Sequence, residues 1–215
     1  MTATMIFVLL SSCLAKEPST DNKGKWGVSL SASGLSNLGI GLYQGGIGVK
    51  HWCSNGFALK SILGFGGERS VIQGYQGYTD NKTNKGNISL NFGTEFHFAQ
   101  ESNFSPYFYT GLNLTNSATT YYNSIPTSNP PSGTWKKRHT STNSIGLDVA
   151  IGLEYLFSEH FSLSGEYQIG LSYQINKEAR YYVAGPGVTE ITRSPSRRST
   201  TFGAKTSSLI LTVYF

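Results

Sequence analysis

Apolar and polar residues alternate along most of this chain with the period of two that is typical of β-strands. In residues 162–175 the odd positions are apolar or aromatic, except for Gly165, and the even positions are polar residues or glycine. Residues 145–157 alternate in the same way, with apolar residues at the odd positions. Together with the turn signals between such segments, the pattern predicts strands at 25–33, 40–52, 57–65, 88–98, 107–114, 145–157, 162–175 and 209–215.

Two of these eight strands alternate less regularly. In 40–52 the apolar residues move from even to odd positions around Gly45 and Gly46, which indicates either a β-bulge or the true beginning of the strand. In 107–114 aromatic residues occupy both faces, so the sequence assigns no phase there.

Short and long connections alternate between the predicted strands. The short turns lie at 53–56, 100–106 and 158–161. The longer, polar loops lie at 34–38, 67–86, 116–143 and 176–206. In an up-and-down meander this alternation places all short turns and both termini at one end and all long loops at the other. Long loops of this kind are usually functional or mobile.

Composition indicates that, if the chain crosses a membrane, it does not do so with helices. Charged residues make up 13% of the sequence, compared with about 25% in soluble globular domains. No stretch reaches the roughly 18 consecutive apolar residues that a transmembrane helix needs. The alternative is a soluble sandwich or ligand-binding barrel with the apolar faces inside. Charges in the middle of the polar faces argue against it, at Glu95, Asp148, Glu154 and Glu166.

The first fifteen residues, MTATMIFVLLSSCLA, contain a short apolar segment that is typical of an export signal. We predict a signal peptide at 1–15, a short periplasmic lead-in at 16–24 and one barrel domain at 25–215. Cleavage near Ala15 and lipidation of Cys13 within LSSC are the two interpretations of the processing site. In either case Cys53 has no second cysteine with which to form a stable intramolecular disulfide.

Three segments resemble the eight-stranded outer-membrane β-barrel family of OmpX-like and OmpA-like barrels. Two are strand–turn–strand units, VKHWCSNGFALKSILGFG and GLEYLFSEHFSLSGEYQIGLSYQ, and the third is the terminal LILTVYF. The resemblance implies an all-β fold, an eight-stranded antiparallel up-and-down transmembrane β-barrel, in the cell outer membrane. The ending is similar to the signal read by the outer-membrane barrel assembly machinery, with Leu209, Leu211, Val213 and Phe215 as its residues.

In such a barrel the apolar face meets lipid and the polar face lines the lumen. Aromatic residues near strand ends are then candidates for interfacial girdles: Trp26, Trp52, Phe98, Tyr107, Tyr155, Phe157, Tyr167, Tyr173 and Phe215. The predicted luminal polar network consists of Lys50, Lys60, Glu95, His97, Asp148, Glu154 and Glu166. Because side chains fill the interior of an eight-stranded barrel, these charges are expected to pair and plug the lumen. A narrow gated pathway and a proton-sensitive His97 are the alternatives.

The sequence gives no basis for a catalytic, cofactor or metal site. His139 and Ser141 are two residues apart, but they lie in a Ser/Thr-rich loop without a recognisable orienting acid. We therefore expect a non-enzymatic protein, with a lipid A-modifying enzyme and a small-solute channel as alternatives.

Positive charge is concentrated in the long loops. The predicted extracellular basic residues are Lys136, Lys137, Arg138, Arg193, Arg197 and Arg198. They are either ordinary solvated charge or contacts for lipopolysaccharide phosphates. The expected partners are outer-membrane lipid, with lipopolysaccharide as a candidate, and the assembly machinery during biogenesis. Nucleic acid is not expected, and the protein is expected to be a monomer that acts in envelope structure or surface interaction.

Overall fold

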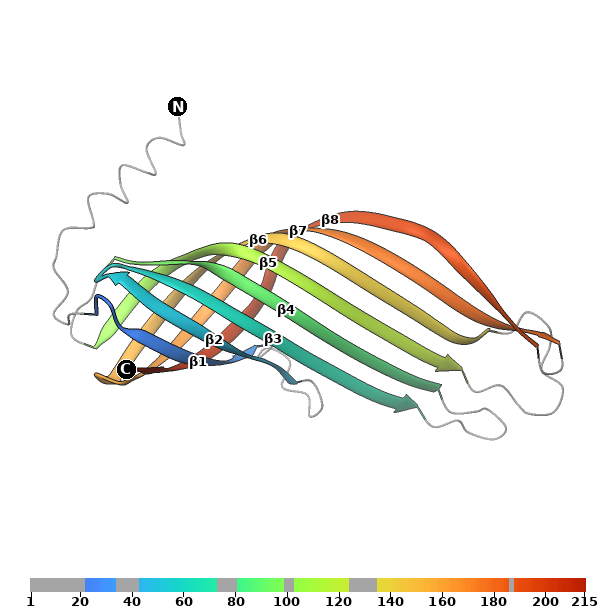
Figure 1. The fold of residues 1–215 in the computed structure, drawn as a ribbon, viewed down its shortest axis with the longest axis horizontal. Helices are drawn as coiled ribbons and strands as arrows, with labels where there is room; N and C mark the ends of the chain where they lie inside the picture. Colours follow the sequence, from blue (N-terminus) through green and yellow to red (C-terminus); the bar gives the residue numbers. More distant parts are fainter. Residues whose placement is uncertain (1–21, 34–42, 73–80, 99–102, 124–134, 186–187) are drawn as a thin grey trace, which may run out of the picture.

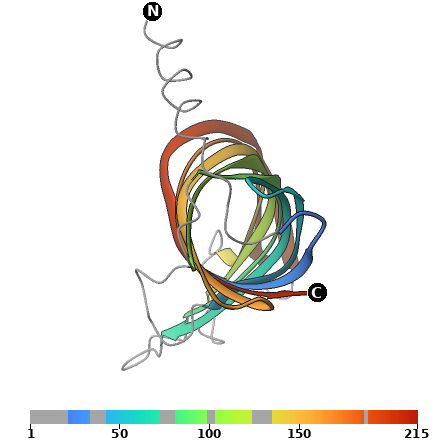
Figure 2. The same ribbon diagram turned by 90° about the vertical axis from the view of Figure 1, so that its left-hand side faces the viewer.

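A computed structural model describes residues 22–33, 43–72, 81–98, 103–123, 135–185 and 188–215. In these ranges the chain forms eight antiparallel strands that close into a barrel in sequence order, as Figures 1 and 2 show. The strands are β1 (Trp26–Ser33), β2 (Tyr43–Ser54), β3 (Phe57–Ile72), β4 (Asn81–His97), β5 (Phe104–Asn123), β6 (Trp135–Ser158), β7 (Phe161–Gly185) and β8 (Val188–Tyr214). The predicted fold class is confirmed, and each predicted strand lies within or overlaps an observed one.

The last strand closes the barrel against the first. Val28 lies opposite Val213, and the pairing continues to Ser33 and Ser208. At the end of the chain, the Phe215 amide donates to the Trp26 carbonyl at 3.0 Å. Closure gives every strand within the barrel wall two neighbours, which is what a hydrocarbon environment requires of backbone amides and carbonyls.

The outward face of the barrel is apolar. Large apolar side chains are exposed there on all eight strands, with Ile88 at 61% and Ile151 at 70% exposure. The buried residues inside the barrel are mostly polar or aromatic. This arrangement is the inverse of a soluble barrel, and an exposed apolar surface of this extent is characteristic of contact with lipid or another apolar partner.

Strands β3 to β8 continue far beyond this apolar belt. The predicted loops 67–86, 116–143 and 176–206 were therefore wrong for their described residues, which lie on these strands, whereas 73–80, 124–134 and 186–187 lie outside the described residues. β5 and β6 stay paired up to Tyr122 and Lys137, and β7 and β8 up to Gly185 and Val188. We call the part of β3–β8 beyond the belt the extension. Both of its faces are mainly polar, with only scattered exposed apolar side chains such as Val71 and Ile191, so its sequence lacks the apolar alternation on which the prediction relied. The predicted basic loop residues accordingly lie on strands: Lys136, Lys137 and Arg138 on β6, and Arg193, Arg197 and Arg198 on β8.

Two of the nine predicted girdle aromatics were also assigned to the wrong face. Trp52 and Tyr107 are 2% and 0% exposed, because both point into the lumen. The register of β2 runs unbroken from Tyr43 to Trp52, which excludes a bulge at Gly45 and Gly46 and leaves Trp52 on the inner face. The remaining aromatic candidates are at least partly exposed: Trp26, Phe98, Tyr155, Phe157, Tyr167, Tyr173 and Phe215.

The segment before β1 is tied to the turn between β2 and β3. The Asn22 amide donates to the Asn55 side-chain oxygen at 3.0 Å, and the Gly24 amide donates to the Trp52 carbonyl at 2.8 Å. The predicted signal peptide, including Cys13, and the start of the lead-in lie outside the described residues. In the part of the chain that the structure describes, no helix has the length and apolar character needed to span a membrane.

Candidate functional site

Five charged side chains from five strands meet inside the lumen. Lys50 on β2 and Lys60 on β3 lie directly opposite each other in the sheet. Two lysines in this position would repel each other, so they require carboxylates around them. These are supplied by Glu95 on β4, Glu154 on β6 and Glu166 on β7. All five residues are at most 4% exposed.

The five charges form a chain of alternating sign, Glu154–Lys50–Glu95–Lys60–Glu166, which we call the luminal chain. Lys50 Nζ lies 2.8 Å from Glu154 Oε2 and 2.7 Å from Glu95 Oε2. Lys60 Nζ lies 2.6 Å from Glu95 Oε1 and also contacts Glu166 Oε1. Every charge in the chain therefore has at least one opposite charge in direct contact, as buried ions require.

Hydroxyl groups satisfy the two ends of the luminal chain. At one end, Tyr214 and Ser162 each donate to Glu154 Oε1 at 2.6 Å. At the other end, Tyr107 donates to Glu166 Oε1 at 2.8 Å. These contacts extend the network to β5 and β8, so seven of the eight strands contribute to it. Charge-assisted hydrogen bonds of this kind are stronger than neutral ones.

Aromatic rings pack against the two ammonium groups. Lys50 Nζ lies 4.5 Å from the centre of the Trp52 ring, and Lys60 Nζ lies 4.7 Å from that of Tyr109. A glycine makes room for one of the luminal tyrosines: a Cβ atom on Gly152 would collide with the Tyr107 ring. Charges, rings and hydroxyls together fill the short-turn half of the lumen.

All seven residues predicted for the luminal network are buried inside the barrel. Five form the luminal chain, and His97 contacts Glu95. Asp148 is 2% exposed and also has an interaction partner. The sequence analysis did not predict the tyrosines of this network. Tyr214 was detectable from the alternation of the last strand, which puts it opposite to Leu211 and Val213, whereas Tyr107 and Tyr109 lie in the strand whose phase was left open.

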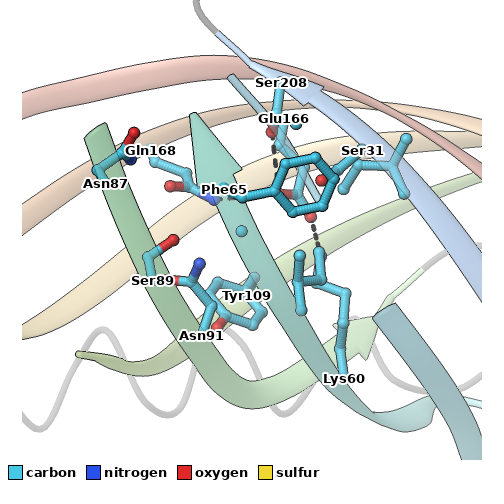
Figure 3. A pocket seen from close by; sticks show the side chains of 14 residues that line it. Ser31, Lys60, Phe65, Asn87, Ser89, Asn91, Tyr109, Glu166, Gln168 and Ser208 are labelled. Carbon is cyan, nitrogen blue, oxygen red and sulfur yellow. Dashed lines mark hydrogen bonds and ion pairs between the residues drawn. The ribbon is translucent and has the colours of Figure 1, made fainter. Parts of the chain in front are cut away.

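A small cavity of about 100 Å³ lies in the lumen, on the side of the luminal chain that faces the extension. We call this end of the barrel the long-hairpin side. Figure 3 shows Lys60, Tyr109 and Glu166 on its wall, together with Ser89 and Asn91. The lining is mainly polar, which suits ordered water better than an apolar ligand.

Glu95, His97 and Glu154 each offer a ligand atom within 4.8 Å of the others, a separation at which three such groups could hold a metal ion. The Lys50 ammonium already contacts both carboxylates, at 2.7 and 2.8 Å. A divalent cation would have to sit beside this positive charge or displace it. The geometry therefore fits an internal ion pair better than a metal centre.

The structure also brings together an acid, a histidine and a serine that the sequence reading did not connect. Glu95 Oε2 lies 3.3 Å from His97 Nε2, and His97 Nδ1 lies 2.7 Å from Ser105 Oγ. A carboxylate only accepts, so Nε2 carries the proton, and in a neutral ring Nδ1 accepts from the Ser105 hydroxyl. His139, whose spacing from Ser141 the sequence analysis set aside as a catalytic signal, bonds Thr120 at 3.0 Å.

In the extension, basic residues lie on both faces of the sheet. On the inner face, Arg138 Nη2 bonds Glu178 at 2.8 Å, and Arg180 contacts the same carboxylate. Partial burial tends to raise the pKa of Glu178, but these hydrogen bonds outweigh it and hold the pKa below its ordinary value. On the outer face, Lys137 Nζ lies 5.5 Å and 5.4 Å from the ring centres of Tyr122 and Tyr181. Arg193, Arg197 and Arg198 are exposed along β8.

The predicted assembly-signal residues occupy the outward face of β8 and the chain end. Leu209 and Leu211 are 42% and 39% exposed, and Phe215 is 72% exposed. Val213 shares their face and is half-buried. That the assembly machinery reads these residues stays a prediction.

Comparison with known proteins identifies the family. Residues 5–193 match the family described as "Outer membrane protein beta-barrel domain". A major outer membrane protein from Thermus thermophilus has a similar fold, with 14% identity, a TM-score of 0.53, and coverage of 89% of this chain and 99% of that chain.

The outer membrane protein OprG from Pseudomonas aeruginosa is similar at 13% identity and a TM-score of 0.52, over 92% of this chain and 99% of that chain. No curated protein matches the sequence significantly. The structural likenesses concern the fold, whereas the family match covers most of the sequence. The chain therefore belongs to the outer membrane protein β-barrel domain family, whose location is the cell outer membrane.

Proposed function

We propose that this protein is a non-conducting outer-membrane barrel that acts in envelope structure or surface interaction. The luminal chain carries this proposal, because five buried charges and the tyrosines bonded to them cross the lumen between opposite walls. A permeating solute would have to break several of these contacts at once. Removing one partner of a buried ion pair typically costs about 3–5 kcal/mol.

The extension supports the second half of the proposal. Beyond the apolar belt, the strands remain paired over many residues and present polar and basic side chains. A paired sheet holds its side chains in fixed positions at little further entropic cost, which suits recognition. Its position on the long-hairpin side, opposite to the chain terminus, suits contacts outside the cell.

Planar-bilayer recording tests the plugged lumen. The wild-type protein should give no stable conductance steps. The double variant Lys50→Ala and Glu154→Ala should conduct. It removes both members of one ion pair, so it opens space in the lumen without leaving one member buried and unpaired. Reproducible steps from the wild type would reject the proposal. Cells with and without the gene should then differ in envelope integrity or surface attachment, and no difference in either would reject the proposed role.

A second candidate function, ester hydrolysis, is favoured by the Glu95–His97–Ser105 arrangement. His97 is placed to accept the proton of Ser105 Oγ as that oxygen attacks a carbonyl carbon. Ser105 is only 1% exposed, however, and Glu95 is also bound by two lysines. The arrangement thus suits a structural role better, and its place at the short-turn end is far from lipid A in the outer leaflet.

Labelling with a fluorophosphonate separates the two functions. We expect no label on the folded wild-type protein and an unchanged lipid A mass spectrum in cells that carry it. Label that is present on the wild type and absent from Ser105→Ala would establish a reactive serine and favour the enzyme.

A further inference from the structure

A row of alternating lysine and tyrosine side chains crosses the outer face of the extension. The sheet register places Lys82 on β4 opposite Tyr122 on β5, Tyr122 opposite Lys137 on β6, and Lys137 opposite Tyr181 on β7. The ammonium groups lie 5.9, 5.5 and 5.4 Å from the neighbouring ring centres. With strands about 4.8 Å apart, the row is about 15 Å long. We call it the Lys–Tyr row.

The row lies on the same face of the sheet as the apolar belt. On β6, Lys137 and the exposed Ile145 are eight positions apart, and so are Tyr122 and Leu114 on β5, so the members of each pair point to the same face. No register shift interrupts the pairing of β5 with β6 between these positions. The chain rises by eight residue steps between Ile145 and Lys137. At about 3.3 Å per residue and a tilt near 40°, the row lies about 20 Å beyond the belt.

The outer face around the row is cationic. Lys177, which lies opposite Ser141, and Arg193, which lies opposite Ala179, share this face and are exposed. Arg198 lies opposite Ile175, at the upper limit of the belt. Among the described side chains of the extension, the acidic residues are Glu68 and Glu178, and both are paired with basic residues on the inner face.

We propose that the Lys–Tyr row binds the phosphorylated core oligosaccharide of lipopolysaccharide in the surrounding outer leaflet. This inference rests on the surface-interaction function proposed above and names its partner. The row faces sideways from the barrel, toward neighbouring lipid molecules, at the height of their sugars. Tyrosine rings offer flat surfaces to the C–H faces of sugar rings, and lysine ammonium groups bind phosphate as compact charges. Arg198 and Lys177 continue the positive charge down toward the lipid phosphates.

The same strands provide matched controls. Lys82 and Lys85 lie on β4 but on opposite faces, and Lys85 pairs with Glu68 at 2.8 Å. Tyr121 and Tyr122 are adjacent on β5 and also point to opposite faces, with Tyr121 next to Arg138. Substitutions at Lys85 and Tyr121 therefore remove a positive charge or an aromatic ring from the extension but leave the residues of the Lys–Tyr row unchanged.

The binding experiment uses the full folded chain in phosphatidylcholine nanodiscs, with heat-modifiable gel migration as the folding check for each variant. The probes are rough lipopolysaccharide with a phosphorylated core, the same lipopolysaccharide after enzymatic removal of core phosphates, and heparin. The wild type should bind the phosphorylated form about tenfold more tightly than the dephosphorylated form. This comparison needs no variant, so it is decisive even if a variant fails to fold.

Among the variants, Lys82→Gln combined with Lys137→Gln should weaken binding about tenfold, and Tyr122→Leu about threefold. Lys85→Gln, Tyr121→Leu and the charge-preserving Lys137→Arg should stay within about twofold of the wild type. The proposal would be overturned by an equal loss of binding for Lys85→Gln and for the combined Lys82→Gln and Lys137→Gln variant, by equal binding of both lipopolysaccharide forms, or by binding of heparin alone. The conductance of the barrel has no bearing on this binding proposal. Failure of the binding proposal can therefore be distinguished from failure of the non-conducting barrel.

Discussion

Replacing Lys60 by methionine would leave the luminal chain with too much negative charge. The wild-type chain has two ammonium groups and three carboxylates, a net charge of −1. Lys60→Met leaves one ammonium and three carboxylates, a net charge of −2, and deprives Glu166 of its ammonium partner. Breaking a buried pair from one side costs about 3–5 kcal/mol, so we expect the free energy of unfolding to fall by that amount.

Adding Glu166→Gln to Lys60→Met should restore part of the lost stability. The double variant has one ammonium and two carboxylates, a net charge of −1, with Lys50 still between Glu95 and Glu154. A glutamine at 166 keeps an oxygen that accepts from Tyr107, which donates to Glu166 Oε1 in the wild type. Contacting residues couple by about 0.5–3 kcal/mol, so the loss in the double variant should be smaller than the sum of the two single losses by about that amount.

The measurement is a urea titration of the protein folded into lipid vesicles, followed by tryptophan fluorescence and heat-modifiable migration. Lys85→Met serves as the control, because its pair with Glu68 is 47% and 27% exposed. An exposed pair contributes about 0–1 kcal/mol, so this variant should be almost neutral. If Lys60→Met were equally neutral, or if the losses of Lys60→Met and Glu166→Gln simply added, the luminal chain would not be a coupled, stabilising unit.

Three further predictions concern the chain end, the tyrosine packing and the extension. Deleting Phe215, which is 72% exposed at the closing strand, should reduce insertion into the outer membrane in a fractionation assay, whereas deleting Ser132 should not; equal insertion would leave the terminal aromatic without a role. Gly152→Leu should prevent or slow folding in vesicles, because its side chain would collide with Tyr107, and a wild-type folding yield would contradict this packing. The pKa of Glu178 lies below its ordinary value of 4.5, so its ion pairs should stabilise the extension above that pH and be lost as the pH falls through the lower folded pKa; a carboxyl NMR midpoint at or above 4.5 would contradict this.

The sequence predicted the strands because the membrane imposes a period of two. Lipid on one side and a polar lumen on the other separate odd from even residues, as in 145–157. In the extension, polar residues predominate on both faces of the sheet, so the sequence there carries no alternation that distinguishes one face from the other. Tyr122 and Lys137, for example, are paired strand residues, but the sequence around them is as polar as that of a loop. The same absence of contrast explains why Tyr107 had no assigned phase, since aromatic residues neighbour it on both faces.

The sequence also predicted seven of the buried polar residues, but not their partners. Lys50 binds Glu154 across a separation of 104 residues, and Lys60 binds Glu166 across 106. Alternation fixes which face a residue occupies, whereas partner choice depends on strand register and on the closure of the barrel. Neither is contained in the local pattern. The Glu95–His97–Ser105 arrangement was missed because it depends on the register of β4 with β5, in which His97 lies opposite Tyr107.

The luminal chain and the Lys–Tyr row are linked by the register of the strands that carry both. On β4, β5, β6 and β7, each residue of the row is an odd number of positions from a member of the luminal network, as Lys137 is from Glu154. Residues an odd number apart point to opposite faces, so burying the network places the row outside. A slip of one residue would turn Lys137 inward and expose Glu154 to lipid, at a cost of several kcal/mol for the unpaired charge. The buried ion pairs therefore do more than fill the lumen, since they select the one register that presents the row to the outer leaflet.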